Sequence, residues 1–136
     1  MNVEKGILQL SVGKQAEFEY DVDGDLLEIY FQRGNASCTV ELTDDIVLRF
    51  DWEKVIPLSL ALMSASHIMQ PAEFGDVYFE LMLQEYSKEI QDKLLRMLRT
   101  SPLNEILQIA SFAPAHSHKM KALATIKHSP QFAIAA

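Results

Sequence analysis

Apolar and polar residues alternate along the first half of the chain with a period of two. Between Ala36 and Thr43 every second side chain is apolar, and Ser, Thr and Glu lie between them. Because the side chains of a β-strand point alternately to opposite faces, this pattern predicts a strand with one buried and one solvated face. Similar stretches cover residues 17–22, 27–32 and 46–53, with a weaker one at 7–12. The residues expected to face inward are Leu8, Leu10, Val12, Phe18, Tyr20, Val22, Leu27, Ile29, Phe31, Ala36, Cys38, Val40, Leu42, Ile46, Leu48, Phe50 and Trp52.

Short polar breaks separate these stretches. The pair Asp23-Gly24 is typical of a tight hairpin turn, because the primed turns need a positive φ that Gly adopts freely. Further breaks fall near residues 34, 44 and 53. Connections this short predict neighbouring antiparallel strands, and therefore a β-meander of four to five strands within residues 1–68.

Residues 55–69 allow two interpretations. As a strand, the stretch would point Ile56, Leu58, Leu60 and Leu62 inward, and Pro57 would need a sheet edge or a β-bulge because it cannot donate to the ladder. As a continuous apolar run, it is also compatible with a buried helix. The strand is the favoured interpretation.

The period changes to between three and four after Pro71, which predicts a long amphipathic helix from about Gly75 to Arg99. Its apolar stripe is wider than a surface helix needs, so the stripe should cover the sheet or a second subunit. We take it as the possible interaction face, made of Phe79, Met82, Tyr86, Ile90, Leu94 and Met97.

One or two shorter helices are expected after the long one. Ser101-Pro102 is typical of an N-cap followed by the first helical residue, and Pro114 would end that helix. Residues 119–127 could form another short helix. The chain is thus expected to be a single α+β domain over 1–136, with a β-meander at 1–68, a helical part at 71–113 and a partly ordered tail at 114–136.

Size and composition fit one cytoplasmic domain. The chain has 136 residues, of which 49% are hydrophobic, and no apolar run is long enough to span a membrane or to act as a signal peptide. The single Cys38 cannot form an internal disulfide, which favours a reducing compartment. The net charge is −7, and residues 1–53 hold twelve acids and four bases, so the sheet should repel nucleic acid. Residues 106–136 hold three lysines and no acid; a solvated tail is favoured over a contact with an acidic partner or with the chain's own acidic half.

The stretch from Tyr20 to His67 resembles a small bacterial family known as domain of unknown function 2283. The shared elements are Tyr20-Asp21, a polar turn, Asp25-x-Leu27 with an aromatic strand, and a later strand ending near Ala65-Ser66. The chain has Trp52-Glu53-Lys54 where the family usually has a Gly in a turn. The resemblance covers about a third of the chain, implies a β-meander and implies no activity.

Metal-binding patterns are incomplete. The series Glu19-x-Asp21-x-Asp23-Gly24 is similar to the opening of a calcium loop, but the twelfth position is Tyr30 instead of a bidentate Glu, so no metal site is expected. His116 and His118 form a close pair, with His128 ten residues on, but zinc needs three or four ligands. His67 is interpreted as structural.

No catalytic frame is visible in the sequence. Cys38 falls on an inward strand position, and the serines lack a nucleophile-elbow pattern. We expect no catalytic residues and no cofactor, and interpret the chain as a non-enzymatic protein–protein interaction module. Its partner would be a second copy or a small protein bound through the helical half. The alternative is an antitoxin-like regulator that neutralises a small toxin, an enzyme being the third choice.

Overall fold

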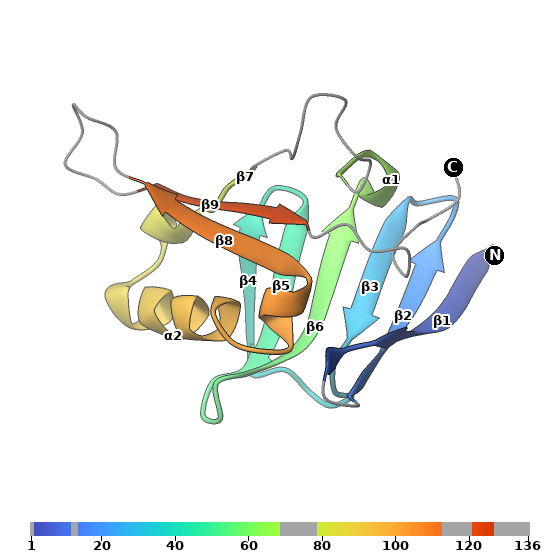
Figure 1. The fold of residues 1–136 in the computed structure, drawn as a ribbon, viewed down its shortest axis with the longest axis horizontal. Coiled ribbons are helices and arrows are strands. Elements are labelled where there is room, and N and C mark those ends of the chain that lie inside the picture. Colours follow the sequence, from blue (N-terminus) through green and yellow to red (C-terminus); the bar gives the residue numbers. More distant parts are fainter. Residues whose placement is uncertain (1, 12–13, 69–78, 113–120, 127–136) are drawn as a thin grey trace.

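The computed structural model describes residues 2–11, 14–68, 79–112 and 121–126, which fold into two antiparallel sheets and a few short helices (Figure 1). The strands are β1 (Val3–Gln9), β2 (Gln15–Asp21), β3 (Leu26–Tyr30), β4 (Cys38–Thr43), β5 (Ile46–Asp51), β6 (Ile56–Met63), β7 (Phe79–Glu80), β8 (Leu107–Phe112) and β9 (Lys121–Ile126). The helices are α1 (Ala65–Ile68) and α2 (Lys88–Leu98), with the 3₁₀ turns η2 (Leu83–Glu85) and η3 (Leu103–Glu105). The predicted α+β class is confirmed at this level.

The large sheet has the strand order β1-β2-β3-β6-β5-β4. The predicted antiparallel β-meander is confirmed, in the form of two three-stranded meanders joined through their third strands, β3 and β6. The expectation that every strand pairs with the next one in sequence is wrong between β3 and β4. The difference lies in residues 31–37, where the polar break near residue 34 predicts a turn between neighbouring strands. Seven residues can span about 23 Å, whereas β3 and β4 are three strand spacings, or about 14 Å, apart.

The alternating pattern places most of the expected side chains in the core. Val22 is an exception: it lies just past the end of β2 and is exposed, and Val12 lies outside the described residues. Ile29, Leu48 and Leu60 come from three neighbouring strands and are fully buried, which confirms the faces assigned to these stretches. Residues 56–63 form a strand, not a helix. The strand accommodates Pro57 because the register between β5 and β6 shifts beside it, between Arg49 and Phe50.

The helical half differs most from the prediction. The long helix is wrong in extent: α2 begins only after Ser87, whose hydroxyl accepts a hydrogen bond from Ile90 N–H, and Phe79 lies in β7 instead. Of the one or two shorter helices expected, only the 3₁₀ turn η3 follows Ser101-Pro102 among the described residues. Residues 107–112 and 121–126 pair as the β8–β9 hairpin, so the helices expected there are wrong. β7 adds to this hairpin and completes a second, three-stranded sheet.

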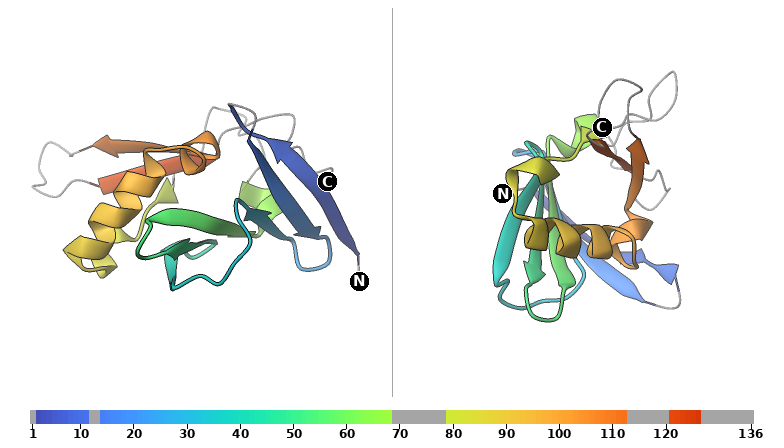
Figure 2. Two further views of the ribbon diagram at one scale, coloured as in Figure 1. Left: turned by 90° about the horizontal axis from the view of Figure 1, so that it is seen from below. Right: turned by 90° about the vertical axis from the view of Figure 1, so that its left-hand side faces the viewer.

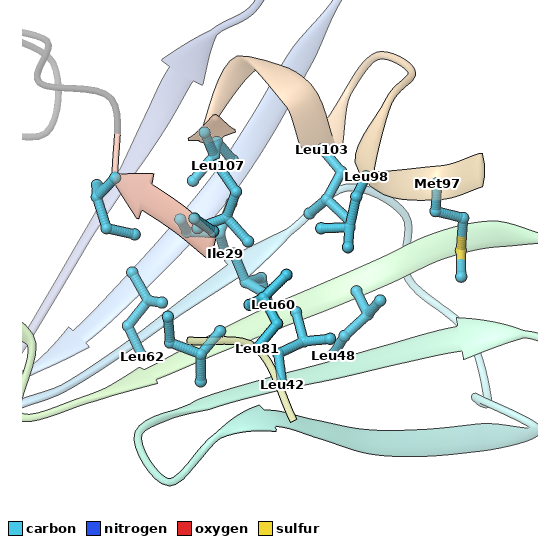
Figure 3. Packing of buried hydrophobic residues seen from close by; sticks show 14 of the residues in the cluster. Ile29, Leu42, Leu48, Leu60, Leu62, Leu81, Met97, Leu98, Leu103 and Leu107 are labelled. Carbon is cyan, nitrogen blue, oxygen red and sulfur yellow. The ribbon is translucent and has the colours of Figure 1, made fainter. Parts of the chain in front are cut away.

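The second sheet and α2 lie on the same side of the large sheet, as Figure 2 shows. Between them a single apolar cluster joins both halves of the chain: Leu98, Leu103 and Leu107 pack opposite Ile29 and Leu60 (Figure 3). These side chains are fully buried. The stretch after residue 79 therefore supplies the second layer of the core.

Candidate functional site

Most residues of the predicted interaction face pack within the chain's own core. Leu94 and Met97 are buried in the core, while Phe79, Tyr86 and Ile90 are partly buried and pack against it. The sixth member, Met82, is half-buried; only Ile90, Leu94 and Met97 lie on α2. The six residues thus come from β7, the η2 region and α2, and they do not form one exposed helical stripe.

Lys93 fixes α2 against the end of β5. Its ammonium nitrogen lies 3.6 Å from the centroid of the Trp52 ring and donates a 3.0 Å hydrogen bond to the Trp52 carbonyl. A cation over an indole face is attracted by the ring's electron density. The helix is therefore attached to the sheet by a polar contact as well as by its apolar side chains.

The β4 edge of the large sheet is closed by the chain itself. The Tyr86 hydroxyl donates to the Glu41 carbonyl and accepts from the Glu41 N–H, both at 2.9 Å. Beside it, the Met82 N–H donates a 2.8 Å bond to the Leu42 carbonyl. One side chain and one backbone group thus occupy positions at which another strand would pair, which is how native proteins protect sheet edges.

The β1 edge, at the other end of the sheet, has no neighbouring strand among the residues that the structure describes. Hydrogen bonds from Val22 N–H to the Asn2 carbonyl and from Leu10 N–H to the Lys14 carbonyl fix the phase of the β1–β2 ladder. Because hydrogen-bonded and non-hydrogen-bonded pairs alternate in an antiparallel ladder, the even-numbered residues of β1 bond to β2. The odd-numbered residues, which are Val3, Lys5, Ile7 and Gln9, point their backbone groups outward. Within the described part of the chain, nothing hydrogen-bonds to these groups.

The side chains along this edge are partly apolar. Ile7 is 59% exposed and Val3 is 39% exposed, on the face that also carries Lys5. Lys5 lies 4.0 Å from Glu19, which makes a loose ion pair. A seven-residue edge strand with exposed β-branched side chains is the kind of surface to which other strands add, and Glu4 and Lys5 are its two charged residues.

Next to the edge, β2 carries an acidic pair that is partly neutralised. Arg33 donates hydrogen bonds to the Glu17 carboxylate, the shorter at 3.0 Å, and to Glu19 at 3.3 Å, and its guanidinium stacks 3.7 Å above the Tyr30 ring. Burial, helped by the carboxylate of Glu28, raises the pKa of Tyr30 to about 12. These contacts hold the outer surface of β2 and β3 in a fixed arrangement.

Gly6 leaves room for the Phe18 ring to lie against β1. Its Cα faces the ring of Phe18 on β2, and a Cβ added at Gly6 would lie 2.4 Å from the ring's Cζ. An aromatic ring lying over a glycine on the neighbouring strand covers the backbone that the glycine leaves bare. The contact holds β1 to the sheet while its other edge remains open.

A polar cluster at Asp25 joins the β2–β3 turn to α1. The carboxylate accepts hydrogen bonds from the Tyr20 hydroxyl at 2.6 Å, from Ser66 N–H at 2.9 Å and from the Ser66 hydroxyl at 2.7 Å. Burial acts to raise the pKa of Asp25, but the bonds from Tyr20 and Ser66 together outweigh it and lower the pKa below the usual range. The bond to Asp25, with a contribution from burial, raises the pKa of Tyr20 to about 12.

This cluster brings together residues on which the sequence resemblance rests. Tyr20, Asp25 and Ser66 lie up to 46 positions apart and meet through direct hydrogen bonds. The backbone carbonyl of Asp25 also accepts from Ala65 N–H at 3.0 Å, so the cluster satisfies the start of α1. All three side chains are engaged with one another, which gives the cluster a structural role.

The remaining sequence candidates are dispersed. Glu19 and Asp21 lie on β2, and the Asp21 carboxylate accepts a bond from Gly24 N–H within the turn. Among the residues that the structure describes, no three His, Cys, Asp or Glu side chains gather as metal ligands would. Cys38 is half-buried against the core, and His67 is exposed on α1. The residues His116, His118 and His128 lie outside the described residues.

No described helix has both the length and the apolar character needed to cross a membrane. In comparisons with protein-family models, with curated proteins and with solved structures, nothing matches this chain. The resemblance to the family of unknown function, the toxin-partner alternative and the cytoplasmic setting therefore stay predictions. The sequence pattern predicts the first strand at residues 7–12, whereas β1 spans Val3–Gln9 and begins four residues earlier, so its outer edge is not evident from the sequence.

Proposed function

We propose that this chain is a non-enzymatic protein-interaction module that docks through the open edge of β1, and that its partner is a second copy of the chain. The observation that carries the proposal is the contrast between the two edges of one sheet. Tyr86 and Met82 close the β4 edge, whereas no described residue pairs with the outward backbone groups of the odd-numbered residues of β1. A sheet that protects one edge and leaves the other bare is suited to strand addition at the bare edge.

Pairing between two copies of β1 would be antiparallel about a two-fold axis, as in most homodimers. Because the outward backbone groups of β1 belong to odd-numbered residues, an odd-numbered residue of one copy must lie opposite an odd-numbered residue of the other. A register with Lys5 opposite its own copy places like charges together, which destabilises a pair. A register with Ile7 opposite its own copy buries the most exposed large apolar side chain of the edge and sets Lys5 across from the neutral Gln9. We favour this second register.

The expected dimer is weak. Three facing pairs give about six hydrogen bonds between the copies, each contributing about 1 kcal/mol net. Burial of two Ile7 side chains adds about 3 kcal/mol, and the loss of rigid-body freedom opposes association by at least about 4 kcal/mol. Such a narrow contact belongs to the transient class of interfaces, with a dissociation constant on the order of 100 µM.

Sedimentation equilibrium over about 10 to 500 µM protein tests the proposal. Wild-type chain should shift from monomer to dimer across this range, and Ile7→Lys should stay monomeric because it places a charge in the centre of the contact. Met63→Lys is the matched control: Met63 is 37% exposed, but it lies on the central strand β6, away from the edge. It should dimerise like the wild type. A wild type that is monomeric throughout, or an Ile7→Lys variant that dimerises equally, would refute the proposal.

A further inference from the structure

A cavity of about 440 Å³ lies where the β1–β2 hairpin, the end of β3, the β5–β6 turn and the α2–η3 connection meet. Most of its lining is apolar, with four neutral polar side chains besides. The apolar members are Leu10, Phe31, Val55, Ile56, Pro57 and Pro102. Concave sites of roughly 300 to 1,000 Å³ with mainly apolar walls and a few polar groups are the usual form of small-molecule sites.

The lining of this cavity includes a positive side chain although the chain is acidic overall. The sequence holds 19 acidic residues, yet among the described residues that line the cavity the one charged side chain is Lys14. The carboxylate of Glu105 lies next to the lining residue Ser101, whose hydroxyl donates a 2.6 Å hydrogen bond to it, and it accepts a second 2.6 Å bond from Ser11 N–H. These bonds from neutral groups orient the Glu105 carboxylate without removing its charge, and the ammonium group of Lys14 is the part of the lining that can pair with an anionic ligand.

Val55, which forms part of the apolar wall, is held in an unfavourable backbone conformation. Its φ is 54°, in the left-handed region that β-branched residues rarely adopt. The turn around it is fixed by Asp51: the backbone carbonyl accepts from Val55 N–H at 2.9 Å, and the carboxylate accepts from Glu53 and Lys54 N–H. Gly or Asn would adopt this φ at lower cost, but only an apolar side chain maintains the wall. Strained residues of this kind concentrate at ligand sites.

We infer that this cavity binds a small amphipathic carboxylate, with its apolar body against Phe31, Val55 and Pro57 and its carboxylate on Lys14. The apolar walls supply affinity by burial, and the single ammonium group selects for a negative head. The site is separate from the outward edge of β1 and does not depend on the dimer, so the two proposals fail or succeed independently.

Titration of the ¹⁵N-labelled full chain with octanoate, followed by amide chemical shifts, tests the inference, with octan-1-ol as the uncharged probe of equal chain length. Octanoate should give saturable shifts centred on the amides of Phe31, Val55 and Thr100. Octan-1-ol should bind at the same place about three- to fivefold more weakly, the effect of one partly exposed ion pair.

Two variants with the same change of charge separate the cavity from the general surface. Lys14→Gln should weaken octanoate about three- to fivefold and leave octan-1-ol unchanged. Lys54→Gln removes an exposed cation from the neighbouring turn, outside the cavity lining, and should leave both probes unchanged. Shifts that do not saturate by about 10 mM, equal binding of the two probes, or equal losses in both variants would overturn the inference.

Discussion

Replacing Leu94 by Ala tests whether the apolar stripe of α2 belongs to the monomer's core or to a contact between chains. Leu94 lies on α2, is fully buried and belongs to the hydrophobic core cluster. Truncation removes its buried methyl groups and leaves a cavity, which together cost about 3 kcal/mol in comparable cores. With a slope of about 2 kcal/mol per molar urea, the unfolding midpoint should fall by about 1.5 M.

The assay is urea unfolding followed by the fluorescence of the single Trp52, at protein concentrations of about 2 and 100 µM. The loss relative to wild type should be the same at both concentrations, because the contact lies within one chain. Arg96→Ala, an exposed change on the same helix, should stay within about 0.5 kcal/mol of wild type. A Leu94→Ala loss below about 1 kcal/mol, or one that grows with protein concentration, would refute the placement of this stripe in the core.

Three further changes test individual contacts. Tyr86→Phe should lower the free energy of unfolding, measured by thermal unfolding, by about 1 kcal/mol, because it removes the bonds to the backbone of Glu41. The freed backbone groups should also promote association at the β4 edge, and unchanged light scattering on heating would contradict this. Tyr20→Phe should lower the free energy of unfolding by about 1 to 2 kcal/mol at neutral pH. Folding raises the pKa of Tyr20 from 10.0 to about 12, so the stability that its hydroxyl contributes is complete below pH 10 and is lost as the pH rises toward 12. The free energies of unfolding of wild type and Tyr20→Phe should therefore become equal near pH 12. A difference that stays constant with pH would contradict this prediction. Gly6→Ala should destabilise by about 1 to 3 kcal/mol by displacing the Phe18 ring, and Gly6→Ala combined with Phe18→Ala should lose less than the sum of the single changes; additive losses would argue against the contact.

Period-two alternation predicted the strands of the large sheet because one face of each strand is buried and the other is solvated. Ile29, Leu48 and Leu60 were assigned to the correct face from spacing alone. The order of the strands was not accessible in this way. Whether β3 pairs with β4 or with β6 depends on how the buried faces of all the strands pack together. The seven-residue connection after β3 is long enough for either arrangement.

The prediction for the second half of the chain failed for a different reason. Leu103, Ile106 and Leu107 recur at spacings of a helix, yet short apolar segments fit a strand equally well, and pairing with β9 decided the outcome. The start of α2 was predictable from Ser87, a good N-cap residue directly before Lys88. The open edge of β1 and the cavity beside Val55 depend on which strands and turns meet, so no local pattern marks them.

Amide hydrogen exchange of β1 at low and high protein concentration tests the central claim most directly. In the proposed register the N–H groups of Lys5, Ile7 and Gln9 should exchange rapidly in dilute protein and become protected at about 500 µM, while that of Val3 stays rapid. The N–H of Gly6 bonds to β2 and should be protected at both concentrations, as the internal reference. Rapid exchange of the three odd-numbered amides at both concentrations would contradict docking through this edge.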